Sequence, residues 1–266
     1  ASFGVANKEP NRNDYTESTP ESRPIHETLY DTEIGYKQVG KKMTFGANLY
    51  FMNYKNQLVM TGKMNDVGVR THVNIAESFR KGIEVEGSYS LTTKLTWAAN
   101  ITLSENKIES PFIEDVDNWD TGGVDEVTHE NTDLSFSPNI IWTSQLNYQL
   151  DKNISIDFIS KYVGEQFIDN TSSKDRMLKD YLVNHLRLTY DWESKIFKTA
   201  KLSLLVNNLL NNEYVNNAWV YRFTSDSWDP RESDHYVNID SEKGYNMAGY
   251  FPQASRNYLL GLTLGF

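Results

Sequence analysis

Acidic side chains crowd the segment 109–133 of this 266-residue sequence, and they are spaced closely enough to form a candidate binding site. Carboxylates recur along the segment and no Lys or Arg interrupts them. The run Asp115-Val116-Asp117-Asn118-Trp119-Asp120 offers closely spaced carboxylates, which are ligands that hard cations such as Ca²⁺ prefer. It lacks the turn glycine and the closing glutamate of a calcium loop. We therefore expect a solvated acidic loop without a metal, and calcium binding is the alternative.

Aromatic side chains gather in and beside the last long loop, residues 221–250. They are Trp219, Tyr221, Phe223, Trp228, Tyr236, Tyr245, Tyr250 and Phe251. Trp and Tyr combine a flat apolar surface with a polar group, which suits the mouth of a ligand-binding site. We expect ligand contact from at least one of four candidates: Trp219, Tyr221, Trp228 and Tyr236. Packing of this loop against neighbouring loops explains the same residues as easily.

The sequence contains no enzyme motif. G-x-S-x-G, Walker, Rossmann and H-E-x-x-H patterns do not occur. His26, His72, His129 and His235 fall in expected loops, and His185 falls on the polar face of an expected strand. We expect no catalytic residue, no resident metal and no cofactor.

Charged residues lie on the polar faces of several expected strands. The sequence groups Arg80 with Glu84 and Glu86, Asp157 with Lys161 and Glu165, and Arg187 with Asp191. If the polar faces line the interior of a closed sheet, these residues would hold whatever fills that interior through hydrogen bonds and ion pairs. The alternative is that a wet interior simply tolerates charge.

Strands with period-two alternation must position all of these residues. Leu95, Trp97, Ala99, Ile101 and Leu103 alternate with small or polar residues, so one face is apolar and the other polar. The same pattern recurs in about ten strands. The expected strands are 2–6, 28–37, 43–54, 79–91, 95–103, 140–150, 154–165, 182–192, 202–211 and 257–266.

The connections between these strands are alternately short and long. Residues 39–42, 92–94, 151–153 and 193–200 are short, whereas 7–26, 61–74, 109–133, 169–180 and 221–250 are long. Short turns at one end and long loops at the other are typical of an up-and-down transmembrane β-barrel. The fold class we predict is therefore all-β, a transmembrane antiparallel up-and-down barrel.

A soluble β-sandwich is the competing fold, because alternation marks any half-buried strand. Three features favour lipid. Many strands reach the roughly 9–11 residues that cross a bilayer. Aromatic residues at strand ends suit an interfacial girdle, and a sandwich does not need the asymmetry of the loops. The girdle candidates are Tyr50, Tyr54, Tyr162, Phe167, Tyr190 and Trp192.

Composition excludes several classes of protein. Lys+Arg number 26 against 36 Asp+Glu, and a net charge of −10 argues against nucleic-acid binding. With no cysteine, the chain has no disulfide framework and no thiol nucleophile. The mean hydropathy is −0.58, and no apolar run is long enough for a transmembrane helix. No signal peptide opens the chain at Ala1, so we expect a mature protein or a fragment. Because no linker divides the chain, we expect one architectural unit.

The last strand ends in a regular apolar pattern. Apolar residues occupy every second position from 258 to 266 and the final residue is aromatic: Tyr258, Leu260, Leu262, Leu264 and Phe266. The pattern resembles the C-terminal signal that outer-membrane barrels present to the barrel-assembly machinery. An ordinary edge strand with an apolar end is the alternative. If the signal is real, Phe266 is the true C-terminus.

Several segments together resemble the C-terminal barrel portion of TonB-dependent outer-membrane receptors, especially those of Bacteroidetes. They are 1–15 (ASFGVANKEPNRNDY), 27–36 (ETLYDTEIGY), 48–59 (NLYFMNYKNQLV), 80–84 (RKGIE), 162–164 (YVG), 206–214 (VNNLLNNEY) and the ending just described. The resemblance covers essentially the whole chain. It implies active uptake of a scarce nutrient across the bacterial outer membrane, the ligand being a ferric siderophore, cobalamin, haem or an oligosaccharide.

The resemblance also implies what the chain lacks. Such receptors are 22-stranded barrels with a plugged lumen, so residues 1–266 correspond to the C-terminal barrel part without the plug. The implied partners are outer-membrane lipid, the plug and remaining strands, the TonB complex acting through the plug, the assembly machinery and a small-molecule or glycan ligand. Two alternatives remain: a self-standing ten-stranded outer-membrane protease, which would use loop residues such as Asp234 and His235, and a soluble β-sandwich binding module.

Overall fold

The computed structural model describes residues 1–266 except 17, 19–22, 65–69, 194–195 and 266. Strands make up nearly all of its regular structure. In chain order the elements are β1 (Ser2–Lys8), α1 (Arg12–Thr16), β2 (Glu27–Val39), β3 (Met43–Met64), β4 (Arg70–Ser90), β5 (Leu95–Ile108), β6 (Phe112–Asn118), β7 (Gly123–His129), β8 (Thr132–Asp133), β9 (Ile140–Gln149), β10 (Ile154–Val163), β11 (Gln166–Phe167), β12 (Met177–Leu178), β13 (Tyr181–Trp192), β14 (Thr199–Asn207), β15 (Val215–Thr224), η1 (Pro230–Glu232), β16 (Val237–Ile239), β17 (Tyr245–Pro252) and β18 (Asn257–Gly265).

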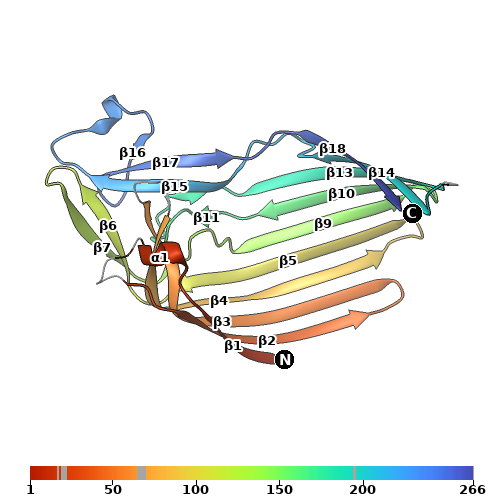
Figure 1. Cartoon of the computed structure of the whole chain (residues 1–266), viewed down its shortest axis with the longest axis horizontal. Coiled ribbons are helices and arrows are strands. Elements are labelled where there is room, and N and C mark those ends of the chain that lie inside the picture. Colours follow the sequence, from red (N-terminus) through yellow and green to blue (C-terminus); the bar gives the residue numbers. More distant parts are fainter. Residues whose placement is uncertain (17, 19–22, 65–69, 194–195, 266) are drawn as a thin grey trace.

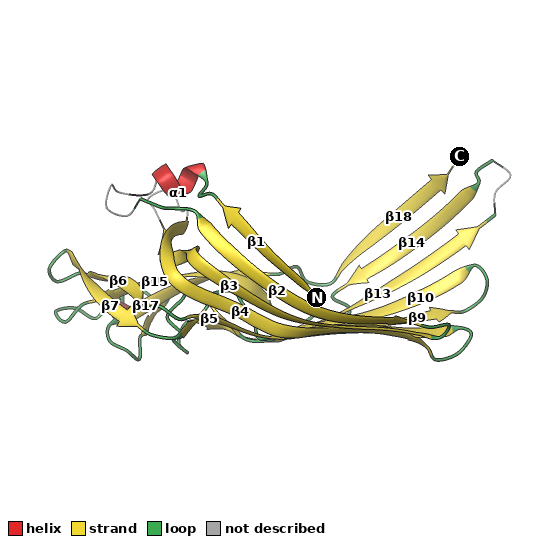
Figure 2. Cartoon of the chain, turned by 90° about the horizontal axis from the view of Figure 1, so that it is seen from below, coloured by secondary structure: helices red, strands yellow, loops and turns green. Residues whose placement is uncertain are grey.

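One large antiparallel sheet dominates the molecule. Its order is β1-β2-β3-β4-β5-β9-β10-β13-β14-β18, with β8 paired to β5 off this path. These are the ten strands that the alternation predicts, in the predicted order. Each strand pairs with the next along the path, so the topology is up-and-down. Figure 2 shows the sheet curved into a trough, with β1 and β18 on opposite sides. In the described part of the chain these two strands do not pair, and the sheet stays open.

The register collects apolar residues on one face of the large sheet. A single row across it runs Tyr36, Ala47, Val85, Ile101, Trp142, Tyr162 and Leu182. Many side chains on this apolar face are exposed, Trp97 by 44% and Leu188 by 37%. No second described sheet covers them, whereas a β-sandwich would bury such a face against its partner sheet. The arrangement argues against the sandwich.

The connections divide as the sequence predicts. The short turns lie at one end of the large sheet and the long segments at the other, on the left in Figure 1. The long segments form a second sheet of order β16-β17-β15-β6-β7 and the small pair β11-β12. We call this end, formed by the segments 109–139, 164–180 and 208–256, the loop layer. Among the described residues no helix is long and apolar enough to span a membrane, and α1 has five residues.

The buried apolar residues lie mainly where the loop layer meets the large sheet. One cluster joins the ends of β3, β4 and β5 to β6, and consists of Val59, Ile75, Ile108, Phe112 and Leu134. A second packs β15 on the β11–β12 segment through Ile168, Leu178, Ala218 and Val220. Both clusters hold segments that are distant in sequence against one another, so the loop layer is a packed structure with a core of its own.

Candidate functional site

Alternation inside the loop layer aims charged side chains at its core. On β6 the even positions Phe112, Glu114 and Val116 are buried, and on β15 Ala218, Val220 and Arg222 are buried. Period two puts each set on one face of its strand. Glu114 lies between Phe112 and Val116, and Arg222 follows Val220, so both charged side chains are buried with the rest of their faces. Buried charges must then be paired.

Arg176 and Arg222 supply the pairing from two other segments. Arg176 is 0% exposed, and its Nη1 lies 2.6 Å from Glu114 Oε1 and 3.3 Å from Asp169 Oδ2. Arg222 Nη1 lies 2.5 Å from Glu114 Oε2. The two Nε atoms face opposite oxygens of the buried Asp240 at 3.6 and 3.7 Å. We call Glu114, Asp169, Arg176, Arg222, Asp240 and Glu242 the ion cluster.

The ion cluster shifts the proton affinity of its carboxyls in opposite directions. Burial by itself would raise the pKa of Glu114, but the hydrogen bond from His129 and the charges of Arg176 and Arg222 outweigh it and lower that pKa to about 2. Asp169 has a less favourable balance, because burial raises its pKa more than Arg176 and Thr171 lower it. Glu114 is therefore the anion on which the two guanidinium groups converge.

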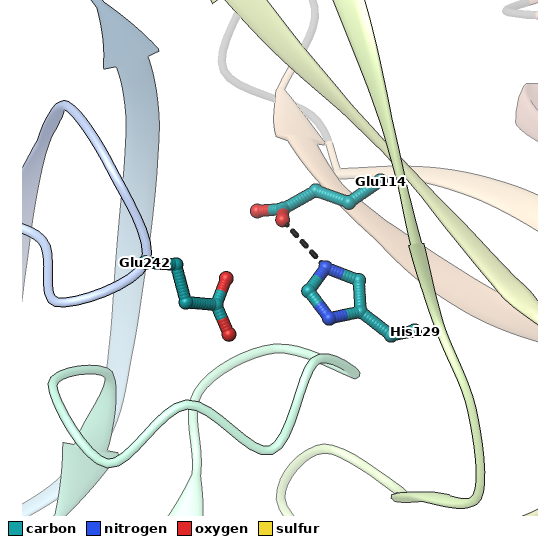
Figure 3. A group of neighbouring side chains, drawn as sticks. All are labelled: Glu114, His129 and Glu242. Atoms are coloured by element: carbon teal, nitrogen blue, oxygen red, sulfur yellow. Dashed lines mark hydrogen bonds and ion pairs between the residues drawn. The ribbon is translucent and has the colours of Figure 1, made fainter.

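A metal ligand set is also present in this region. Glu114, His129 and Glu242 offer atoms within 4.8 Å of one another, and Figure 3 shows the carboxylate of Glu242 directed toward the other two. Arg222 Nη1 is 3.2 Å and Arg176 Nη2 3.4 Å from Glu242 Oε2, so both guanidinium groups lie beside the same atoms. Their positive charge opposes a cation at this place. We assign the group as an ion-pair centre.

An aromatic stack lies on another part of the loop layer. The ring of Trp119, in the turn between β6 and β7, stacks on Phe223 of β15 with centroids 4.0 Å apart, and Phe223 is 0% exposed. Trp228 lies nearly parallel to Trp119, at 5.8 Å and 14°. Tyr221 and Tyr245 complete the group at 5.5 Å from Phe223. Two loop-layer strands, the β6–β7 turn and the segment after β15 therefore contribute to one aromatic surface.

Hydrogen bonds fix the stack from both sides. Trp119 Nε1 donates to the Tyr221 hydroxyl at 3.0 Å, and that hydroxyl donates to Asp117 Oδ2 at 2.8 Å. Burial raises the pKa of Tyr221, with Asp117 adding to the rise. Asp120 accepts from the backbone N–H of Asp226 and from the Ser225 and Ser227 hydroxyls, which lowers its pKa to about 2. The turn that carries Trp119 is thereby tied to the segment that carries Trp228.

Two of the four predicted ligand-contact residues, Tyr221 and Trp228, belong to the aromatic stack. The other two lie outside it. Trp219 lies further along β15 over Gly249, where its indole fills the space that a Cβ would need. Tyr236 is 74% exposed. Whether any of them touches a ligand stays a prediction.

The other loop residues singled out from the sequence have local roles. Asp117 and Asp120 of the calcium-like run accept the hydrogen bonds just described and point to different partners. Asp234 accepts a hydrogen bond from the backbone N–H of Tyr236 at 2.9 Å, as in a turn, and His235 beside it is exposed. In neither arrangement do the side chains converge on a common point, as metal ligands or a catalytic pair must.

Charged residues on the polar face of the large sheet pair across strands and not along them. Residues four apart on a strand are separated by about 13 Å, whereas cross-strand neighbours are about 5 Å apart. Arg80 donates to Asn106 and Ser137, and Glu86 pairs with Lys37 at 3.7 Å. The predicted grouping of Arg80 with Glu84 and Glu86 is therefore wrong.

The same correction applies to the second group of polar-face charges. Asp157 accepts from Gln145 and Asn147 at 2.9 and 2.8 Å, and Lys161 stands opposite Thr143 and Val183. Arg187 stands opposite Asp157, and the Asp191 expected beside it pairs with Lys201. Glu84 lies opposite Asn48 and Thr102 and lines a hollow of this face with Glu86.

Two residues of the predicted aromatic girdle lie on the wrong face. Tyr50 and Tyr54 stand opposite Gly82 and Ser78, among the polar-face positions. The Tyr50 hydroxyl is 2.6 Å from where a Cβ at Gly82 would be, so glycine makes room for the ring. The even positions of β3 from Thr44 to Tyr54 stand opposite the polar-face positions of β4, so the alternation itself contains the signal. Tyr190 and Trp192, with rings 5.8 Å apart, remain at the turn end of β13.

The predicted assembly residues are on β18. Tyr258, Leu260, Leu262 and Leu264 stand opposite Val206, Leu204, Leu202 and Ala200 of β14 and are exposed. Phe266 lies outside the described residues. The other edge of β18 has no partner strand among the residues that the structure describes.

The large sheet and the loop layer together have the architecture of one part of an outer-membrane-type β-barrel. Its outer face is apolar, its inner face is polar and its long loops pack at one end. The chain belongs to the family described as TonB dependent receptor-like, beta-barrel, whose model matches residues 20–209. No curated protein matches the sequence.

Solved structures show the same fold at low sequence identity. The ferric-catecholate import receptor Fiu of E. coli K12 is 18% identical with a TM-score of 0.60, and the alignment covers 97% of this chain and 31% of Fiu. The copper transporter OprC is 17% identical with a TM-score of 0.66, covering 99% and 36%. The ferric yersiniabactin uptake receptor FyuA of Yersinia pestis is 15% identical with a TM-score of 0.56, covering 90% and 30%. The chain spans about a third of the length of these receptors.

Proposed function

We propose that the chain is the C-terminal part of the barrel of a TonB-dependent receptor that takes up a scarce nutrient across the bacterial outer membrane. The observation that carries the proposal is the open ten-stranded sheet with one apolar face, in a chain of this family. The apolar face meets outer-membrane lipid, and the polar face lines the lumen. The protein is a transporter and not an enzyme.

The two free edges of the sheet support the fragment assignment. Unpaired backbone donors and acceptors at β1 and β18 cannot remain unsatisfied in hydrocarbon. The remaining strands of a 22-stranded barrel would pair with both edges and close it. The barrel-assembly machinery would then insert the complete protein, reading the apolar pattern at the end of β18.

The polar face supports a plug in the lumen. Arg80, Glu84, Glu86, Asp157, Lys161 and Arg187 all lie on this face. In a lumen that holds a plug, these side chains would form hydrogen bonds with the plug. The TonB complex would break those bonds during transport. The plug itself is not among residues 1–266.

The proposed function is tested in cells that make the complete receptor. Deletion of its gene should slow growth when iron, cobalamin, haem or a glycan is limiting, and deletion of the TonB partner should give the same defect without being additive. Membrane fractionation should place the receptor in the outer membrane. If deletion of the receptor gene slows growth further in cells that already lack TonB, uptake does not depend on TonB and the proposal is wrong.

A further inference from the structure

Two tryptophans of the loop layer are held rigidly without being buried. Trp119 is 46% exposed and Trp228 is 49% exposed, although their rings lie 5.8 Å apart and within 14° of parallel. A tryptophan side chain stabilises the folded protein mainly when its indole is buried. Rings that remain half exposed while neighbouring side chains fix their orientation are typical of a surface built to receive a ligand.

The fixation removes most of the ordering cost of binding. The Trp119 ring stacks on Phe223, and the Trp119 indole N–H donates a hydrogen bond to the Tyr221 hydroxyl. Asp120 holds the 225–227 segment next to Trp228 through backbone and hydroxyl donors. Side chains that are already ordered do not lose rotamer entropy when a ligand arrives, and preorganised sites bind more tightly for that reason.

The charge around the stack selects against anionic ligands. Carboxylates in the same turn and in the adjoining segment are Asp115, Asp117, Asp120, Asp125, Glu126, Asp226 and Asp229. The described cations beside them, Arg231 and Lys243, pair with Asp229 at 2.5 Å and Asp226 at 3.9 Å. Such a surface repels polyanionic metal chelates within a Debye length of about 8 Å.

We propose that Trp119 and Trp228 form a binding platform for the neutral sugar rings of an oligosaccharide. The proposal rests on the proposed receptor function and names its ligand class. The apolar C–H face of a pyranose ring packs on an indole, and its hydroxyl groups donate hydrogen bonds to nearby carboxylates. Neutral rings meet no electrostatic penalty at this acidic surface.

The test uses the complete receptor, purified in detergent, and calorimetric titration with five neutral hexasaccharides: α-1,4-glucan, β-1,4-glucan, β-1,4-xylan, β-1,4-mannan and α-1,6-mannan. We expect at least one to bind, and Trp119→Ala and Trp228→Ala each to weaken that binding at least tenfold. Trp228→Phe, which keeps an aromatic ring, should restore most of the affinity. Trp142→Phe, on the apolar face of the large sheet, is the matched control and should bind like the wild type.

Each contrary result has a distinct meaning. Absence of binding to all five oligosaccharides, or binding that neither alanine variant weakens, overturns the platform. An iron(III) tris-catecholate complex that binds and depends on Trp119 also overturns the ligand class, while the receptor function stands. The receptor function fails separately, if uptake does not require TonB. Unchanged circular dichroism and heat resistance of the alanine variants show that lost affinity is not lost folding.

Discussion

Removal of the Glu114 carboxylate should loosen the loop layer. Its pKa falls from 4.5 to about 2 in the folded protein. A shift of one pKa unit corresponds to about 1.4 kcal/mol, so the ionised carboxylate contributes about 3 kcal/mol to the ion cluster at neutral pH. Glu114→Gln has the shape of the protonated acid and should remove this contribution. The guanidinium groups of Arg176 and Arg222 would then share the remaining carboxylates.

The sign of the pH dependence follows from the direction of the shift. A carboxyl with a lowered pKa contributes stability that is present above its unfolded pKa and is lost as the pH falls through the folded pKa. The contribution of Glu114 is therefore complete above about pH 4.5 and disappears toward pH 2. Burial raises the pKa of Asp169, so its contribution has the opposite sign. Comparison of variant and wild type at each pH isolates Glu114, because Asp169 is present in both.

Amide hydrogen exchange in the complete receptor measures the effect locally. Local opening of peptides that cover β6 and β15 should become about 3 kcal/mol easier in Glu114→Gln at pH 7, which is roughly a hundredfold faster exchange. The difference should shrink as the pH is lowered toward 3. Asp229→Asn is the matched control, because its pKa is also about 2 but its pairing with Arg231 is solvent-exposed. Equal protection of β6 and β15 in Glu114→Gln and wild type at pH 7 would refute the reasoning.

Three further predictions concern the barrel. Ile101→Arg, on the apolar face, should cost about 2–4 kcal/mol of barrel stability in liposome unfolding. Asn100→Arg, on the opposite face, should cost little. Equal losses of stability in the two variants would contradict the assignment of the apolar face to lipid. Epitope tags in the complete receptor should be labelled on intact cells at Asp120 but not at Lys152, and the reverse pattern inverts the topology. Residues 1–266 expressed alone should not form a stable closed barrel, because β1 and β18 each have one edge without a partner strand among the residues that the structure describes. A heat-resistant monodisperse monomer would revive the self-standing barrel.

The sequence by itself determines the large sheet. Alternation in a segment such as 95–103 reports which residues share a face, because the side-chain period of a strand is two and depends only on the local backbone. All ten strands and their order follow from this pattern. The same parity places Tyr50 and Tyr54 on the polar face, a consequence that aromatic composition alone obscures.

Only the tertiary structure decides which residues of the loop layer meet. Glu114 and Arg222 are 108 positions apart, and Trp119 reaches Trp228 from a different loop. No periodicity in the sequence relates such residues. Their loops meet because the curved sheet brings the ends of distant strands together. Polar-face ion pairs depend on the tertiary structure for a related reason. Neighbours along a strand are too far apart to pair, and the register with the next strand selects the partner, as it does for Asp191 of β13 and Lys201 of β14.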